Sequence, residues 1–180
     1  MKVGSQAPDF LLTDKDGVAV NLSAIESEFV VIYFYPKDDT PGCTIEGIEF
    51  SACLSKLKKL GATVIGISGG DDASKAKFCA KHKLKVTLLS DTDLSVSKAY
   101  GAFGEKSFMG RRYKGILRKT FVVSGERKLV KIFDSVTAKG HAAEVVAFLE
   151  SGVVAADVVA PTPKVQRVRK GLGKKRAPTK

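Results

Sequence analysis

The amino-acid sequence predicts an α/β fold built on a mixed central sheet. Two runs of β-branched and aromatic residues, at 29–35 and 62–68, have the length of strands that are buried on both faces. Each run is followed by a stretch whose apolar residues have helical spacing, at about 41–60 and about 72–83. Strands that alternate with helices pair in parallel through crossover connections, so this half of the chain predicts a parallel core.

A β-hairpin precedes this core. Residues 7–12 and 18–22 read as two short strands on either side of the turn Asp14-Lys15-Asp16-Gly17. Pro36 ends the first long strand, and a polar loop then leads into the first long helix, which Gly61 stops.

The second half of the chain contains shorter elements. An aspartate after Gly69-Gly70 caps the second helix, a strand at 86–89 and a helix at 95–100 follow, and the Gly-, Lys- and Arg-rich segment 101–115 reads as a loop. Residues 116–123 and 128–133 predict a closing hairpin, which adds antiparallel edges, and a last amphipathic helix spans about 138–149. This order of elements is that of a decorated thioredoxin-like fold.

The composition argues against several classes of protein. No segment approaches the roughly 18 consecutive apolar residues of a membrane-spanning helix, and the N-terminus lacks the apolar core of a secretory signal. Three cysteines without a CxxC pair and only two histidines argue against a disulfide scaffold and against a His-rich metal site. We expect a protein of a reducing, cytoplasmic compartment that needs no metal or organic cofactor.

The positive charge is concentrated in a C-terminal segment. The chain carries a net charge of +11, but residues 161–180 hold eight Lys/Arg and no acid, which leaves 22 basic against 19 acidic residues in 1–160. We predict a folded domain at 1–152 and a basic, disordered tail at 153–180. The tail suits a solubilising role, non-specific contact with nucleic acid or, in a eukaryote, nuclear import through Lys174-Lys175-Arg176.

The chemistry of the chain centres on the stretch 35–44, YPKDDTPGCT. Cys43 falls in the first turn of a helix, where backbone N–H groups and the helix dipole favour the nucleophilic thiolate. Pro41 suits that turn because its missing N–H has no intrahelical partner there. The hydroxyl of Thr40 could reach the sulfur and a bound peroxide, and a guanidinium from elsewhere would be the strongest further donor.

The pattern Pro36-x-x-x-Thr40-x-x-Cys43 is similar to the active-site pattern of peroxiredoxins. The stretches YFYPKDDTPGCT, GEKSFMGRRYKGI and LRKTFVV resemble the BCP/peroxiredoxin Q subfamily, and the match extends over about residues 3–149. The resemblance implies a thioredoxin-like fold and a monomer. It also implies thiol-dependent reduction of hydrogen peroxide and organic hydroperoxides. From the lack of a long apolar segment we expect no contact with a membrane.

The resemblance also implies roles for five residues. Cys43 is the peroxidatic cysteine, which a hydroperoxide oxidises to a sulfenic acid. Thr40 orients the thiolate and the peroxide, and Pro36 walls the pocket. Arg118 matches the family arginine that stabilises the thiolate and binds the peroxide oxygens, and Glu46 matches a position that holds this arginine.

One position departs from many members of the subfamily. They place a resolving cysteine five residues after the peroxidatic one, where this chain has Ile48. Cys79 matches the alternative position on the next helix, which implies an atypical two-cysteine enzyme with a Cys43–Cys79 disulfide, reduced by a thioredoxin-type donor. Cys79 lies about 100° from the apolar stripe of its helix, which predicts partial exposure. Four residues form that stripe: Ala73, Ala76, Ala80 and Leu84.

Several alternatives remain beside this interpretation. Cys79 could be incidental, with an external thiol resolving a single-cysteine enzyme. Cys53 shares a helix face with apolar residues and predicts core packing, while His82 and His141 read as surface residues. A thiol–disulfide oxidoreductase would require a CxxC motif that is absent, and a nucleic-acid-binding module would require binding by residues 1–160, whose charge is nearly balanced.

Overall fold

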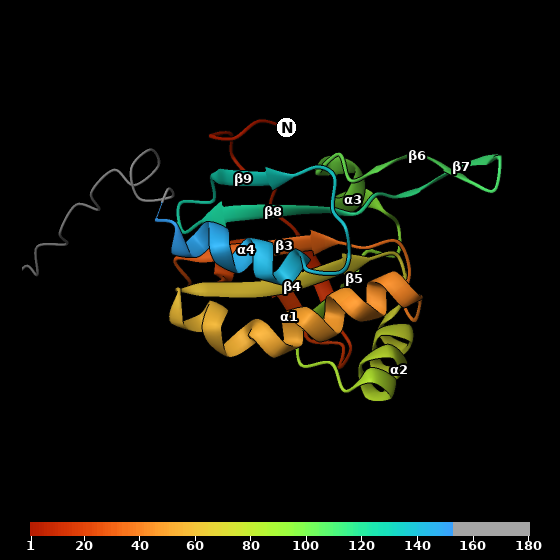
Figure 1. Cartoon of the computed structure of the whole chain (residues 1–180), viewed down its shortest axis with the longest axis horizontal. Coiled ribbons are helices and arrows are strands. Elements are labelled where there is room, and N and C mark those ends of the chain that lie inside the picture. The colour runs from red at the N-terminus through yellow and green to blue at the C-terminus, as the bar shows by residue number, and fades with distance from the viewer. Residues whose placement is uncertain (153–180) are drawn as a thin grey trace, which may run out of the picture.

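The structure is a computed structural model that describes residues 1–152. Its main feature is a seven-stranded sheet with the order β2-β1-β5-β4-β3-β8-β9, covered by helices, and a separate two-stranded hairpin extends away from it (Figure 1). The strands of the large sheet are β1 (Leu11–Asp14), β2 (Ala19–Asn21), β3 (Phe29–Phe34), β4 (Ala62–Ser68), β5 (Thr87–Ser90), β8 (Lys119–Ser124) and β9 (Leu129–Phe133). The α-helices are α1 (Pro41–Lys59), α2 (Asp72–His82), α3 (Ser95–Ala99) and α4 (His141–Glu150), and a short 3-10 helix, η1, spans Leu22–Ala24.

The sheet is mixed, as the sequence predicts. The central strand β3 pairs in parallel with β4 and antiparallel with β8, and β4 pairs in parallel with β5. The hairpin β1–β2 adds antiparallel strands at one edge, and β9 closes the other edge against β8. The predicted N-terminal hairpin, the two long strands and the two long helices are confirmed to within a few residues.

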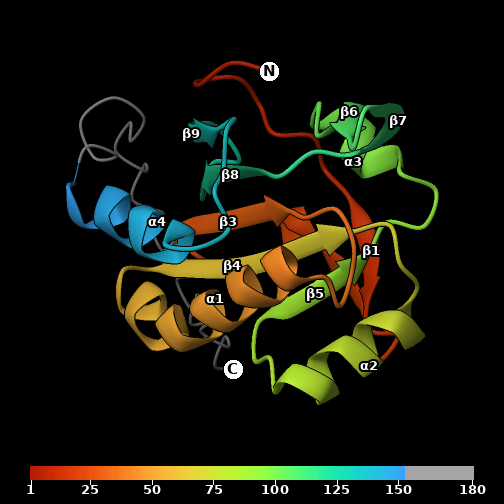
Figure 2. The same cartoon turned by 45° about the vertical axis from the view of Figure 1, so that its right-hand side comes forward.

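Two hydrophobic cores lie on the two faces of the sheet. Successive side chains of a strand point to opposite faces, so Val31 and Tyr33 of β3 join one core while Val30 and Ile32 join the other. Helices α1 and α4 cover the first face, where Phe50 of α1 is completely buried (Figure 2). The short helix α3 and the N-terminal segment cover the second face.

The segment 101–115 is not a loop, so that prediction was wrong. It forms the hairpin of β6 (Phe103–Phe108) and β7 (Arg111–Ile116), and the chain turns at Met109 and Gly110, which both have positive φ angles, of 49° and 77°. A two-residue turn of this kind matches the twist of the paired strands. Because the hairpin extends into solvent, it needs no continuous apolar face. Ile116 closes β7, and the strand predicted from 116 therefore begins only at Lys119.

The buried face of α2 also differs from the prediction. Lys75, Phe78 and Cys79 are buried, whereas Ala73 and Ala80 of the predicted stripe are exposed. An aromatic ring removes much more apolar surface from water than a methyl group does, so Phe78 sets the orientation of the helix. Cys79 is consequently only 6% exposed, and its predicted partial exposure was wrong.

His141 is a second correction, because it is buried rather than on the surface. It begins α4 with 1% exposure, its Nε2 lies 2.8 Å from the Thr120 hydroxyl and its Nδ1 lies 3.2 Å from Glu144. Its ring also packs edge-on against Phe50 and Phe133. Burial lowers the pKa of His141, although Glu144 opposes the shift. These contacts tie α4 to β8 and α1.

In residues 1–152, no helix has the length and hydrophobicity required to cross a bilayer. The predicted basic tail at 153–180 lies outside the described residues.

Candidate active site

The site forms where the central strand passes into the first helix. After β3, the buried Tyr35 leads into a loop at 36–40, and Pro41 occupies the first position of α1. Cys43 is the third residue of that helix and is 2% exposed. Thr40 takes extended backbone angles at the N-cap, and its hydroxyl donates a 3.1 Å hydrogen bond to the carbonyl of Lys37. Among the described residues, no hydrogen bond joins this hydroxyl to Cys43.

Arg118 reaches Cys43 from the neighbouring strand. Lys119, the first residue of β8, pairs with Phe34, the last residue of β3, so Arg118 lies beside the loop that leads to Cys43. Its Nη2 atom donates to the Cys43 sulfur at 3.3 Å, and its Nη1 atom donates to the Glu46 carboxylate. The structure therefore brings together three of the residues that the sequence singled out.

The pKa values of Glu46 and Arg118 are both shifted by their surroundings. Glu46 is completely buried, and burial raises its pKa to about 7, although the charge and hydrogen bond of Arg118 pull in the other direction. Burial also works against the charge of Arg118, but Glu46 and Cys43 outweigh it and raise the pKa of the guanidinium. The Oε1 atom of Glu46 has no hydrogen-bond partner within residues 1–152. A permanent cation is thus held against the sulfur.

Gly42 is a site residue that the sequence reading missed. A Cβ atom at this position would lie 3.2 Å from Nη2 of Arg118 and 3.6 Å from the Cβ of Ala138. Glycine therefore allows the guanidinium to approach the first turn of α1. The available signal was a glycine inside a helix, where it is unfavourable by about 1 kcal/mol relative to alanine.

A buried polar network beside the loop was also missed. Asp38, which is 9% exposed, pairs with the completely buried Lys75 of α2. A lysine on the inner face of a helix and two successive aspartates in a loop were the signals in the sequence. Neither is informative alone, because the two partners are 37 positions apart.

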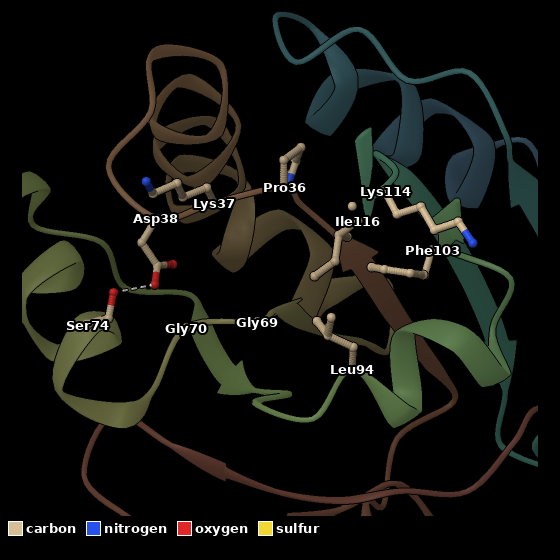
Figure 3. A pocket seen from close by; sticks show the side chains of 11 residues that line it. Pro36, Lys37, Asp38, Gly69, Gly70, Ser74, Leu94, Phe103, Lys114 and Ile116 are labelled. Atoms are coloured by element: carbon tan, nitrogen blue, oxygen red, sulfur yellow. Dashed lines mark hydrogen bonds between the residues drawn. The ribbon is translucent and has the colours of Figure 1, made fainter. Parts of the chain in front are cut away.

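An open pocket of about 410 Å³ borders the loop, and the loop residues Pro36, Lys37 and Asp38 form part of its wall (Figure 3). Cys43, Glu46 and Arg118 do not line it, so the pocket adjoins the cysteine site without containing it. Its walls combine apolar side chains with polar groups of the network. The lining residues are Pro36, Lys37, Asp38, Gly69, Gly70, Ser74, Leu94, Phe103, Lys114, Gly115 and Ile116.

Cys79 lies apart from the Arg118 group. It is an unbonded thiol on α2 that belongs to the same apolar core as Cys43, and burial raises its pKa. A groove of about 280 Å³ borders this helix and is lined by Lys15, Ala76, Cys79, Ala80 and Leu84. Cys53 is partly buried and packs against the core, which confirms the interpretation of that residue as a packing cysteine.

Comparisons with known proteins agree with this geometry. The model of the AhpC/TSA family matches residues 3–132. The putative peroxiredoxin bcp of Helicobacter pylori strain J99 is 43% identical over 145 residues, which cover 81% of this chain and 95% of the relative. Peroxiredoxin Bcp of Escherichia coli strain K12 is 41% identical over 141 residues, which cover 78% and 90%.

Solved structures show the same likeness. The bacterioferritin comigratory protein of Xanthomonas campestris, studied for alkyl peroxide reduction, superposes with a TM-score of 0.75 at 37% identity and covers 80% of this chain and 92% of its own. A cysteine-to-serine mutant of PrxQ from Xylella fastidiosa superposes with a TM-score of 0.79 at 33% identity, and covers 84% and 96%.

The sequence matches extend over most of the chain, and the structural matches give the same thioredoxin-like architecture. The relatives are named peroxiredoxins, and one was studied for alkyl peroxide reduction, in agreement with the buried sulfur beside Arg118. The chain therefore belongs to the AhpC/TSA family, as a thiol-dependent peroxidase of the BCP/peroxiredoxin Q type.

Proposed function

We propose that the protein reduces hydroperoxides by a two-cysteine cycle in which Cys43 attacks the peroxide and Cys79 resolves the product. The observation that carries the proposal is the Arg118 guanidinium, which spans the Glu46 carboxylate and the Cys43 sulfur, 3.3 Å away, at the start of α1. A fixed cation at this position stabilises a thiolate and offers a donor to oxygen atoms that approach the sulfur.

The first step oxidises Cys43. The thiolate attacks one oxygen of ROOH, the S–O bond forms and the O–O bond breaks, and the leaving oxygen departs as ROH after it takes up a proton. Cys43 becomes a sulfenic acid. Arg118 stabilises the charge that develops on the leaving oxygen, Glu46 orients Arg118, Thr40 orients the peroxide, and Pro36 shields the sulfenic acid.

The second step joins the two cysteines. The Cys79 thiol attacks the sulfenic sulfur, the S–S bond forms, and the oxygen leaves as water. Both sulfurs are buried and unbonded in this structure. A disulfide requires Cα atoms about 4.4–6.8 Å apart and side chains that point toward each other. Because α1 and α2 hold the two thiols in the packed core, we expect local unfolding of α1 or α2 before this bond forms.

The cycle ends with reduction of the disulfide. A dithiol protein of the thioredoxin type would supply the two electrons and release both cysteines as thiols. Such a donor attacks a sulfur of the disulfide through a mixed disulfide, so at least one of the two sulfurs must become accessible in the oxidised state.

A single-cysteine cycle is the second candidate. The observation that favours it is the burial of Cys79, which is 6% exposed and packs with Phe78 and Tyr35 in the core. In that cycle an external thiol attacks the Cys43 sulfenic acid and Cys79 only fills space.

Mass spectrometry of the intact protein after one equivalent of peroxide separates the two cycles. The two-cysteine cycle predicts a loss of about 2 Da in the wild type, and a gain of about 16 Da, trapped as a sulfenic acid, in Cys79→Ser. Cys53→Ser is the matched control and should keep the loss. A wild type that gains mass instead would support the single-cysteine cycle.

A further inference from the structure

Two successive aspartates of the active-site loop hold α2, the helix that carries Cys79. Asp38 binds the N-terminal half of the helix, through Ser74 and Lys75. Asp39 binds its C-terminal end, where its carboxylate lies 2.6 Å from Lys81 Nζ and 2.6 Å from His82 Nε2. The loop that leads to Cys43 is thus attached to the helix of Cys79 at two points.

The two attachments differ in burial. The side chains of Lys75 and Asp38 are 0% and 6% exposed, whereas the side chains of Asp39 and Lys81 are 43% and 62% exposed. An exposed ion pair is screened by water and contributes little to stability. A buried pair is different, because separating its members leaves a charge without compensation inside the protein. Asp38 and Lys75 therefore form the strong attachment.

Asp38 is saturated with donors. Its carboxylate accepts hydrogen bonds from Tyr35 at 2.7 Å, from Ser74 at 2.7 Å (Figure 3) and from Lys75 at 3.0 Å, with Ser68 at 3.4 Å. Burial works to raise the pKa of Asp38, but these hydrogen bonds and the charge of Lys75 outweigh it and hold the pKa below its ordinary value. The hydrogen bonds and the charge of Lys75 therefore favour the ionised form of the Asp38 side chain.

Lys75 is equally well satisfied. Its ammonium has three protons, and it donates to Asp38, to the Ser68 hydroxyl at 2.8 Å and to the Gly70 carbonyl at 3.3 Å. A Cβ atom on Gly70 would lie 2.5 Å from Asp38 Oδ2 and 3.0 Å from Lys75 Nζ. The end of β4 thus leaves open the space that the ion pair fills.

Cys79 follows Lys75 by four residues, so the two side chains lie on the same face of α2. Both are buried in this structure, with Phe78 between them in the sequence. A rotation or unwinding of α2 that carries Cys79 toward Cys43 therefore also acts on the contact of Lys75 with Asp38. The ion pair and the thiol cannot move independently while the helix is intact.

We propose that the Asp38–Lys75 pair is a latch that controls when Cys79 is delivered to oxidised Cys43. This proposal rests on the two-cysteine function proposed above. With the latch closed, α2 is fastened to the active-site loop, and the sulfenic acid waits unresolved. When the latch opens, Cys79 attacks the sulfenic sulfur, the disulfide forms and water leaves. Lys75 and Asp38 are positioning residues in this scheme and do not touch the peroxide.

Rapid-quench mass spectrometry measures the two steps separately in one experiment. The variants are Lys75→Met, which keeps the length of the side chain without its charge, and the milder Ser74→Ala, which removes one donor to Asp38. We expect disulfide formation to accelerate by about tenfold or more in Lys75→Met, because the closed state loses its buried pair, and by a smaller factor in Ser74→Ala. Formation of the sulfenic acid should stay within about threefold of the wild type, since Arg118 is untouched.

The matched control is Asp39→Asn, which removes the exposed attachment at the other end of the helix and should leave both rates unchanged. A further readout is the fraction of Cys43 that excess peroxide converts to sulfinic acid, which should fall as the disulfide forms faster. A purely structural role predicts a different result, because general destabilisation would slow both steps together.

The outcomes separate the latch from the function on which it rests. A wild type that forms the disulfide, with an unchanged or slower disulfide step in both Lys75→Met and Ser74→Ala, would overturn the latch alone. A wild type that forms no Cys43–Cys79 disulfide would overturn the two-cysteine function and the latch with it. If Lys75→Met fails to fold, the Ser74→Ala rates decide.

Discussion

Two ion pairs with buried carboxylates flank the loop between β3 and α1, and they are built differently. Glu46 and Arg118 lie on the side of Cys43, and Asp38 and Lys75 lie on the side of α2. The second pair is satisfied on all sides by hydroxyl and carbonyl groups. The first pair is not fully hydrogen-bonded. Glu46 Oε1 has no hydrogen-bond partner among residues 1–152, and Nη2 of Arg118 donates to the sulfur of Cys43.

The difference indicates two functions for the same chemical motif. Buried polar groups are normally hydrogen-bonded, so unused capacity in a buried pair marks a place where chemistry occurs. A fully satisfied pair rigidifies the elements that it joins. The Glu46–Arg118 pair is proposed to serve the sulfur of Cys43, and the Asp38–Lys75 pair holds the helix that is proposed to supply the second sulfur.

The largest effect is expected from Arg118→Ala. The variant removes the fixed cation at 3.3 Å from the Cys43 sulfur. We expect the second-order rate constant with peroxide to fall by about 10²–10³-fold, as for loss of a main electrostatic donor. Stopped-flow mixing with peroxide measures the rate, and circular dichroism confirms the fold. Kinetics near those of the wild type would refute the role of Arg118.

Lys75→Met should affect stability instead. The variant leaves Asp38 buried without its cation, and we expect the free energy of unfolding to fall by about 3 kcal/mol. Urea denaturation of Lys75→Met and of Asp39→Asn provides the comparison, and the exposed Asp39 site should show no measurable change. Equal losses in the two variants would show that burial does not distinguish the two attachments.

The pH dependence of stability tests Glu46. Its pKa is about 7 in the folded protein and near the ordinary 4.5 in the unfolded chain. Between these values the folded state binds more protons, so this group makes the protein less stable as pH rises from about 4.5 to about 7, by roughly 3 kcal/mol in total. Glu46→Gln should remove this slope. Denaturation curves of both proteins across the range measure the difference, and parallel curves would contradict the assignment.

Gly42→Ala should give the smallest change. The new Cβ would press on Nη2 of Arg118 at 3.2 Å, so we expect the rate of peroxide reduction to fall by about 3–10-fold. Alanine is the better helix former, so stability should be equal or higher by up to about 1 kcal/mol. Parallel measurement of rate and melting temperature separates the two effects. An unchanged rate would show that Arg118 adjusts without cost.

Much of this architecture follows from patterns that are local in the chain. The continuous apolar runs identified β3 and β4, Pro41 and Gly61 marked the ends of α1, and the position of Cys43 in the first turn already indicated a reactive thiol. These signals work because strand period, helix capping and the helix dipole act over a few residues. The family motif added Glu46, three residues after Cys43 on the same helix, and Arg118, which no local pattern connects with Cys43.

Local sequence patterns did not predict which polar groups are buried. His141 was predicted to be a surface residue and Cys79 to be partly exposed, and nothing in the sequence singled out Lys75, yet all three are buried. Their partners come from distant parts of the chain: Asp38 lies 37 positions from Lys75, and Thr120 lies 21 positions from His141. A charge or an imidazole is stable inside a protein only when such partners surround it. Only the folded arrangement brings those partners together: α2 meets the loop and the end of β4, and α4 meets β8.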